Sequence, residues 1–128
     1  MSLEYAELLS KGLGMRASAE QDRLYDLHAA ICKTFASPWR LRIVEALGEG
    51  ERTVSELVEM LNIAKSNVSQ HLGVMREKGV VDGRRDGGHV FYRLSNPKTL
   101  VACRLMREVL LEQFQRAGEL SRIGRQVS

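Results

Sequence analysis

The sequence predicts a mainly α-helical fold that carries a single two-stranded β-hairpin. Through most of the 128 residues, apolar side chains recur at three- and four-residue spacings, which is the period of an amphipathic helix. One segment departs from this period, where Val80-Val81 and the run His89–Leu94 flank Asp86-Gly87-Gly88. Two β-favouring runs around such a turn predict a hairpin.

Two helices are expected in the first half of the chain. The first begins near Ala19 and ends before Ser37-Pro38, because proline cannot continue a helix that precedes it. Pro38 then suits the first turn of a second helix, which Gly48 and Gly50 stop.

Two more helices and the hairpin follow. Thr53 and Glu56 have the spacing of a capping box and predict the start of a third helix. After the turn Asn62-Ile63-Ala64, a fourth helix is expected to end at Lys78-Gly79, a basic last turn followed by a capping glycine. Beyond the hairpin, Asn96-Pro97 predicts the start of a long last helix with a wide apolar stripe.

The third and fourth helices have the pattern of a helix-turn-helix. Their apolar positions suit the packing of one helix on the other, and are Leu57, Leu61, Ile63, Val68, Leu72 and Met75. A hairpin directly after the fourth helix makes this a winged helix-turn-helix. We expect residues 19–118 to form this DNA-binding and dimerisation domain, with an N-terminal extension over 1–18 and a C-terminal tail over 119–128. The apolar residues before position 18 suggest that the extension adds a helix to a dimer interface.

Short polar side chains occupy the outer face of the fourth helix, where an ordinary surface helix would more often carry Glu/Lys pairs. Such side chains suit hydrogen bonds to base edges and phosphates in a major groove. Gln70 is the most capable of bidentate pairing with adenine, and His71 either reaches a phosphate or serves the contact between helices. Ser69 could instead bond a carbonyl one turn back. The candidate DNA-binding residues of this helix are Lys65, Ser66, Asn67, Ser69, Gln70 and His71.

Charge and the hairpin support the same function. Residues 1–63 hold 7 Lys/Arg and 10 Asp/Glu, whereas residues 64–128 hold 12 and 6, so the positive field that phosphates require begins at the fourth helix. Arg84, Arg85 and Arg93 of the hairpin are expected to contact the DNA backbone or the minor groove, with His89 at the tip. Alternatively, these arginines only keep the hairpin edge soluble.

Three blocks of the sequence resemble the ArsR/SmtB family of bacterial repressors: FASPWRLRI at residues 35–43, NVSQHLGVMREKGVV at 67–81 and GHVFYRL at 88–94. The resemblance covers roughly residues 24–110. It implies a homodimer that pairs through the first and last helices, binds a palindromic operator on double-stranded DNA, and is released by a metal ion or another inducer. Ala64 departs from the serine that the family often has before the recognition helix, which leaves the first amides to Ser66 or to a DNA phosphate.

The inducer is less well defined. Of the family's two common metal sites, one needs a cysteine motif in the third helix and the other histidines in the last helix, and both are missing here. Cys32, Cys103 and His28 remain as a possible thiol or soft-metal sensor. Cysteines in apolar stripes also pack as small hydrophobic residues, and in the sulfur-responsive members the first cysteine lies after the Arg-Leu-x-Ile motif, whereas Cys32 lies before it.

Other classes of function fit less well. No nucleophile motif, phosphate-binding glycine loop or metal-ligand cluster appears, so neither an enzyme nor a cofactor is expected. No apolar run could span a membrane and no signal segment opens the chain, which predicts a cytoplasmic protein. The alternative is a winged-helix protein-interaction module without specific DNA binding, since a fold alone does not define a function.

Overall fold

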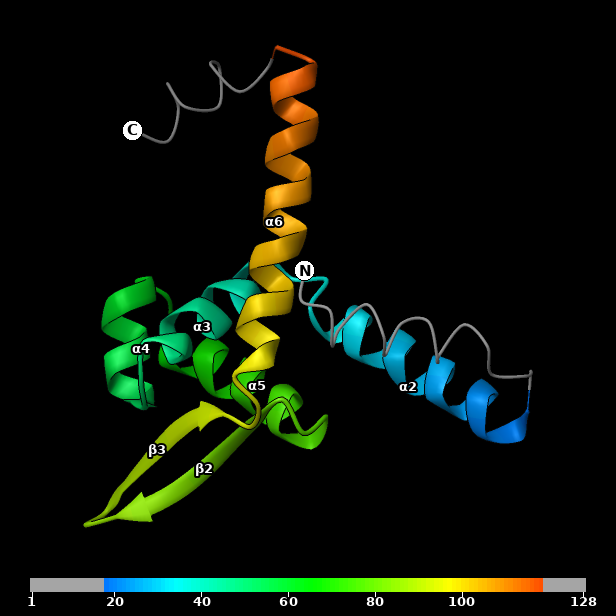
Figure 1. Cartoon of the computed structure of the whole chain (residues 1–128). Coiled ribbons are helices and arrows are strands. Elements are labelled where there is room, and N and C mark those ends of the chain that lie inside the picture. Colours follow the sequence, from blue (N-terminus) through cyan, green and yellow to red (C-terminus); the bar gives the residue numbers. More distant parts are fainter. Residues whose placement is uncertain (1–17, 119–128) are drawn as a thin grey trace. The chain divides into compact units, whose positions relative to one another are not determined.

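The computed structural model describes residues 18–118, and the chain divides into two units, one ending at Thr34 and one beginning at Phe35. The predictions for residues 1–17 and 119–128 lie outside the described residues. The first unit contributes helix α2 (Ala19–Thr34), coloured blue to cyan in Figure 1. At the start of α2, the Ser18 hydroxyl accepts a hydrogen bond from the Gln21 amide at 3.2 Å. The first turn of α2 contains acidic residues and the last turn a basic one, a distribution of charge that the helix dipole favours.

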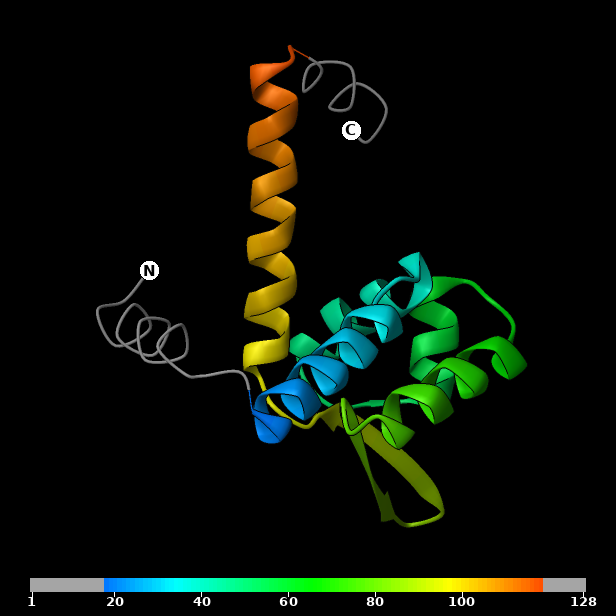
Figure 2. The same ribbon diagram turned by 90° about the vertical axis from the view of Figure 1, so that its right-hand side faces the viewer.

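The second unit contains a helical cluster with a projecting hairpin (Figures 1 and 2). Its elements follow in the order α3 (Pro38–Gly48), β1 (Arg52–Thr53), α4 (Val54–Leu61), α5 (Lys65–Glu77), β2 (Val81–Asp86), β3 (His89–Leu94) and α6 (Lys98–Arg116). This succession confirms the predicted winged helix-turn-helix, in which α4 and α5 are the two helices of the motif and β2–β3 is the wing. Among the described residues, no helix is both long and apolar enough to cross a membrane.

Local signals set the helix boundaries much as the sequence predicts. The Thr53 hydroxyl accepts from the Glu56 amide and the Glu56 carboxylate accepts from the Thr53 amide, both at 3.1 Å, which completes the capping box of α4. Asn62 ends α4 in the left-handed conformation with φ of 55°. The last helix begins at Lys98, and its first amide donates to the Asn96 side chain at 3.0 Å.

The core of the second unit lies among α3, α4, α5 and the start of β2. Its fully buried side chains are Ile43, Val44, Leu57, Val68, Leu72, Met75 and Val81. Four of the six residues predicted to join the helix-turn-helix are among them, whereas Leu61 and Ile63 are partly exposed. The packing of α5 on α4 therefore rests on Leu57, Val68 and Leu72, which fixes the face of α5 that remains outside.

The sheet has one strand more than the predicted hairpin. Its order is β1-β3-β2 and all pairs are antiparallel. The added strand β1 has two residues, with Arg52 opposite Tyr92 and Thr53 opposite Phe91. The wing turn is at Gly87 and Gly88, whose φ values of 58° and 88° are those of a turn that favours glycine and matches the twist of a hairpin.

The junction from α5 to β2 is tightly hydrogen-bonded. Gly79 has φ of 74°, its amide donates to the Arg76 carbonyl at 3.0 Å, and the Val80 amide donates to the Met75 carbonyl at 2.9 Å. These two bonds form a Schellman motif. The predicted capping role of Gly79 is confirmed.

The last helix, α6, contacts α3 with one side and leaves an apolar side exposed. The Glu45 carboxylate of α3 pairs with Arg104 at 2.5 Å and with Arg107 at 3.6 Å. None of the residues of α6 is fully buried, and much of the helix extends past the other helices of its unit (Figures 1 and 2). Its exposed large apolar side chains are Val101, Leu105, Met106, Val109, Leu110 and Leu111.

Candidate nucleic-acid interface

The outer face of α5 presents the polar residues that the sequence singled out. Because Val68, Leu72 and Met75 turn toward the core, the side chains between them point outward. Ser69 is exposed and makes no side-chain hydrogen bond to any residue of 18–118, so its hydroxyl is available to a ligand rather than used inside the helix. The exposed residues of this face are Lys65, Ser66, Asn67, Ser69 and Gln70.

The N-terminus of α5 has no side-chain cap. Ala64 holds the capping position in an extended conformation and no side chain bonds the first amides. The first intrahelical bonds run from the Asn67 and Val68 amides to the Ala64 carbonyl, at 3.0 and 3.1 Å. Ser66 therefore does not compensate for Ala64, and the positive end of the helix dipole faces outward.

His71 lies apart from this row. It is partly buried, and its Nδ1 atom accepts a hydrogen bond from Arg40 Nε of α3 at 3.2 Å. Burial, aided by the positive charge of Arg40, lowers the pKa of His71. A neutral imidazole that accepts at Nδ1 carries its proton on Nε2. His71 was expected either to reach a phosphate or to serve the contact between helices. In the structure it joins α5 to α3 through Arg40.

The arginines of the wing lie on different faces. Successive residues of a strand alternate between faces, so Arg84 and Arg85 point to opposite sides of β2. Arg84 pairs with Glu51, its Nη2 atom 2.7 Å from Oε2 and its Nε atom 2.9 Å from the same oxygen. These bonds raise the pKa of Arg84 and lower that of Glu51. His89 is exposed beside the turn, opposite Asp86, and its ring makes an edge contact with Phe91.

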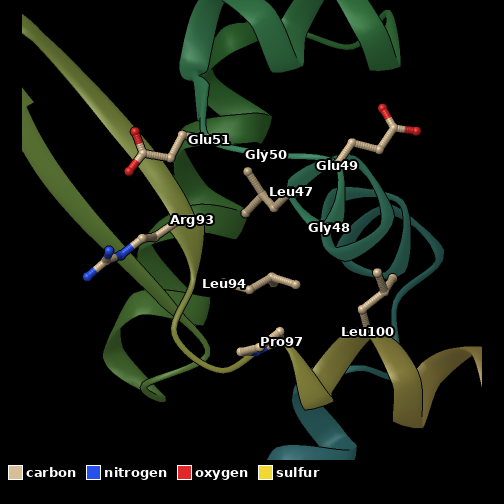
Figure 3. Close-up of a pocket in the computed structure, with 9 residues that line it drawn as sticks. All are labelled: Leu47, Gly48, Glu49, Gly50, Glu51, Arg93, Leu94, Pro97 and Leu100. Carbon is tan, nitrogen blue, oxygen red and sulfur yellow. The ribbon is translucent and has the colours of Figure 1, made fainter.

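A shallow cavity of about 280 Å³ lies where α3, the loop before β1, the end of β3 and the start of α6 meet. Its centre is apolar, and a Cβ added to Gly48 would overlap the Leu100 side chain. Figure 3 shows the charged ends of Glu49, Glu51 and Arg93 pointing away from Leu94 and Leu100, with Glu51 and Arg93 extending on the same side. The charged groups at this cavity therefore point away from its apolar side chains.

The three candidate sensing residues are divided between the two units. His28 and Cys32 belong to α2, where Cys32 is exposed, and Cys103 belongs to α6, where it is partly buried. Burial raises the pKa of Cys103, with Glu45 adding to the rise and Arg107 opposing it. A raised pKa leaves less of the reactive thiolate at neutral pH. Within residues 18–118, no group of three or more His, Cys, Asp or Glu residues is placed to hold a metal ion.

Two functional neighbours were not predicted from the sequence. Arg40 and Glu51 each pair with a candidate residue from a distant part of the chain, 31 and 33 positions away. Arg40 lies in the first of the three family-like blocks, which marks it without giving a role. Glu51 carries no local signal.

A helix-turn-helix with an exposed polar recognition face, followed by a hairpin wing, defines the class of winged-helix DNA-binding proteins. A model of the bacterial regulatory proteins of the arsR family matches residues 37–82. The chain is 42% identical over 92 residues to an uncharacterised HTH-type transcriptional regulator of Mycobacterium tuberculosis, Rv0081. The aligned residues make up 71% of this chain and 81% of that protein. The crystal structure of Rv0081 aligns with a TM-score of 0.68 at 40% identity, covering 73% of this chain and 95% of that one.

Two further relatives agree. The biofilm growth-associated repressor of Xylella fastidiosa is 37% identical over 89 residues, 70% of this chain and 78% of its own length. A homodimeric winged helix-turn-helix DNA-binding domain from Mycobacterium bovis, described as a possible ArsR-family regulator, has a TM-score of 0.71 at 26% identity and covers 78% of this chain and 93% of that one. The chain belongs to the ArsR family of bacterial transcriptional regulators. The family resemblance of the three sequence blocks is thereby confirmed.

Proposed function

We propose that this protein is a sequence-specific, DNA-binding transcriptional repressor that acts as a homodimer on a palindromic operator and is released by an inducer. The row of exposed, uncharged polar residues on α5 carries this proposal. Ser66, Ser69 and Gln70 lie on the outer face of a helix whose buried face is locked into the core. An α-helix fits the major groove, and these side chains match the hydrogen-bonding groups of base edges there.

The dimer is supported by the exposed apolar side of α6. A helix of 19 residues with none fully buried leaves more apolar surface in water than a stable monomer normally tolerates. The exposed Leu24, Tyr25 and Leu27 of α2 are a second such surface. A second copy of the chain is the partner that fits, because a twofold dimer places two copies of α5 against the two halves of a palindrome.

The inducer is proposed by class only. With no preformed metal cluster among residues 18–118, the remaining candidates are a thiol-reactive compound or a soft metal acting at Cys32, Cys103 and His28. The rival function, a protein-interaction module without specific DNA binding, uses the same fold, and the following experiment separates the two.

Fluorescence anisotropy with the DNA upstream of the protein's own gene tests the proposal. The wild-type protein should bind this DNA in preference to a scrambled duplex, and its affinity should fall steeply with salt because each neutralised phosphate releases counterion. Replacing Gln70 with Ala should cost about 1–3 kcal/mol and relax the preference at one base position. Gln115→Ala on α6 is the matched control and should bind as the wild type does. Absence of binding to any DNA at low salt would favour the interaction module.

A further inference from the structure

The register of the wing sorts its charged residues onto two faces. Asp82, Arg84 and Asp86 of β2 stand opposite Arg93, Phe91 and His89 of β3, and all six side chains share one face because directly paired residues point to the same side. We call this the outer face. On the other face, Arg85 stands opposite Val90, and Gly83 stands opposite Tyr92.

Arg84 is held firmly on the outer face. Its guanidinium lies over the Phe91 ring at 4.8 Å from the centroid and reaches the Glu51 carboxylate through three contacts of 2.7 to 3.0 Å. Asp86 adds a contact at 3.4 Å. A guanidinium that pairs in this forked manner and also stacks on an aromatic ring is strongly oriented.

This pairing crosses the sheet. Glu51 directly precedes β1, and β1 and β2 lie on opposite sides of β3. Arg84 therefore extends from one edge strand, over the central strand at Phe91, to the loop that leads into the other edge strand. It joins the projecting wing to the helical cluster at the end of α3.

The charge on the outer face does not favour DNA. Three carboxylates, those of Glu51, Asp82 and Asp86, stand there with two guanidinium groups and one imidazole. On the opposite face, Arg85 is exposed, and Arg76 Nη1 of α5 lies 3.3 Å from where a Cβ of Gly83 would be. Two basic side chains and no carboxylate of the strands share that face, which is where phosphate attraction should concentrate.

On the basis of the proposed DNA-binding function, we infer that Arg84 is a positioning residue that fixes the wing through Glu51, and that Arg85 is the residue of this pair that contacts a DNA phosphate. The two neighbouring arginines then have different roles. Arg84 sets where the wing points, and Arg85 supplies the charge.

A salt titration of operator binding distinguishes these roles. Arg84→Gln and Arg85→Gln remove the same charge from adjacent residues, so each is the control for the other. Loss of one phosphate contact reduces the slope of log affinity against log salt by about 0.9. Because the homodimer contains Arg85 twice, we expect a reduction of about 1.8 for Arg85→Gln. Arg84→Gln should weaken binding by about fivefold, in line with the upper range for an exposed ion pair, with its slope unchanged. A slope reduced equally by Arg84→Gln would overturn the inference.

A charge exchange gives the second test. The double variant Glu51→Arg/Arg84→Glu restores the pair with its polarity reversed and leaves the net charge as it was. It should regain most of the operator affinity that Arg84→Glu loses. If the double variant binds no better than Arg84→Glu, the positive charge at position 84 itself is required, and the positioning role is wrong.

A measurement without DNA separates this inference from the proposed function. Hydrogen exchange of the β2 and β3 amides in the free protein should be faster in Arg84→Gln and Glu51→Gln than in the wild type, and should return toward the wild-type rate in the charge-exchanged variant. Unchanged exchange in both single variants would refute the role of the pair even if DNA binding is intact. Wild-type protein that fails to bind DNA but shows the expected exchange would refute the function alone.

Discussion

Replacing Leu105 with Ala on α6 should weaken self-association of the protein by roughly 30-fold. Leu105 is 51% exposed and belongs to the apolar side of α6, one helical turn from Val101 and one from Val109. If this side is the dimer interface, the exposed half of the Leu105 side chain becomes buried only when two copies pair.

The size of the effect follows from that exposed half. Full burial of a leucine side chain contributes about 1.5–3 kcal/mol, so half of it contributes about 1 kcal/mol. A twofold interface contains the residue twice, which gives about 2 kcal/mol and a roughly 30-fold rise in the dissociation constant. Alanine keeps the helix propensity high, so the loss reports on the interface.

Sedimentation velocity across a dilution series measures this constant. Ser66→Ala, on the outer face of α5, should leave it unchanged. If the double variant Leu105→Ala/Val109→Ala dimerises as tightly as the wild type, this side of α6 is not the interface. A wild-type protein that stays monomeric at all concentrations would remove the dimer itself.

Three further predictions concern stability and reactivity. Leu57→Ala, at a fully buried position, should lower the free energy of unfolding in urea by about 2–5 kcal/mol, and a change under 1 kcal/mol would contradict its place in the core. The hydrogen bond from Arg104 lowers the pKa of Glu45 below its usual 4.5. The ionised carboxylate therefore stabilises the fold above pH 4.5, and this contribution is lost as the pH falls through the lowered pKa. In Glu45→Gln, the melting temperature should consequently depend less on pH on the acid side. Iodoacetamide at neutral pH should alkylate the exposed Cys32 before Cys103, whose pKa burial raises, and mass spectrometry that found the reverse order would contradict the described burial.

The helices and the recognition face could be predicted from the sequence because their signals are local. Apolar spacing and the Thr53–Glu56 capping box define α4 and α5 within a few residues of chain, and once Val68 and Leu72 face the core, the outward direction of Gln70 follows from the helical period. The same reasoning gave the hairpin from its glycine turn.

The features that the sequence did not predict are strand β1 and the side-chain pairs of Arg84 and His71, and each depends on a partner that is distant along the chain. Strand β1 has two residues, too few for an alternating pattern, and exists because β3 lies beside it. Arg84 looks like a free basic residue of the wing until the fold brings Glu51 against it from 33 positions away. His71 likewise takes its role from Arg40. Polar residues are assigned most safely from sequence when their neighbours are on the same element.

The Schellman motif at Gly79 connects α5 to the base of the wing, because the Val80 amide is bonded to α5 while the Val80 carbonyl accepts from the Ser95 amide just after β3. With the Arg84–Glu51 pair holding the wing as well, we expect α5 and the wing to approach a duplex as one rigid unit. Under the proposed function, an inducer then does not release DNA by moving the wing relative to α5. It has to change the distance or the angle between the two copies of α5 in the dimer. The affinity of the protein for a duplex with only one half-site should then be the same with and without the inducer. Its affinity for the intact palindrome should fall when the inducer is added.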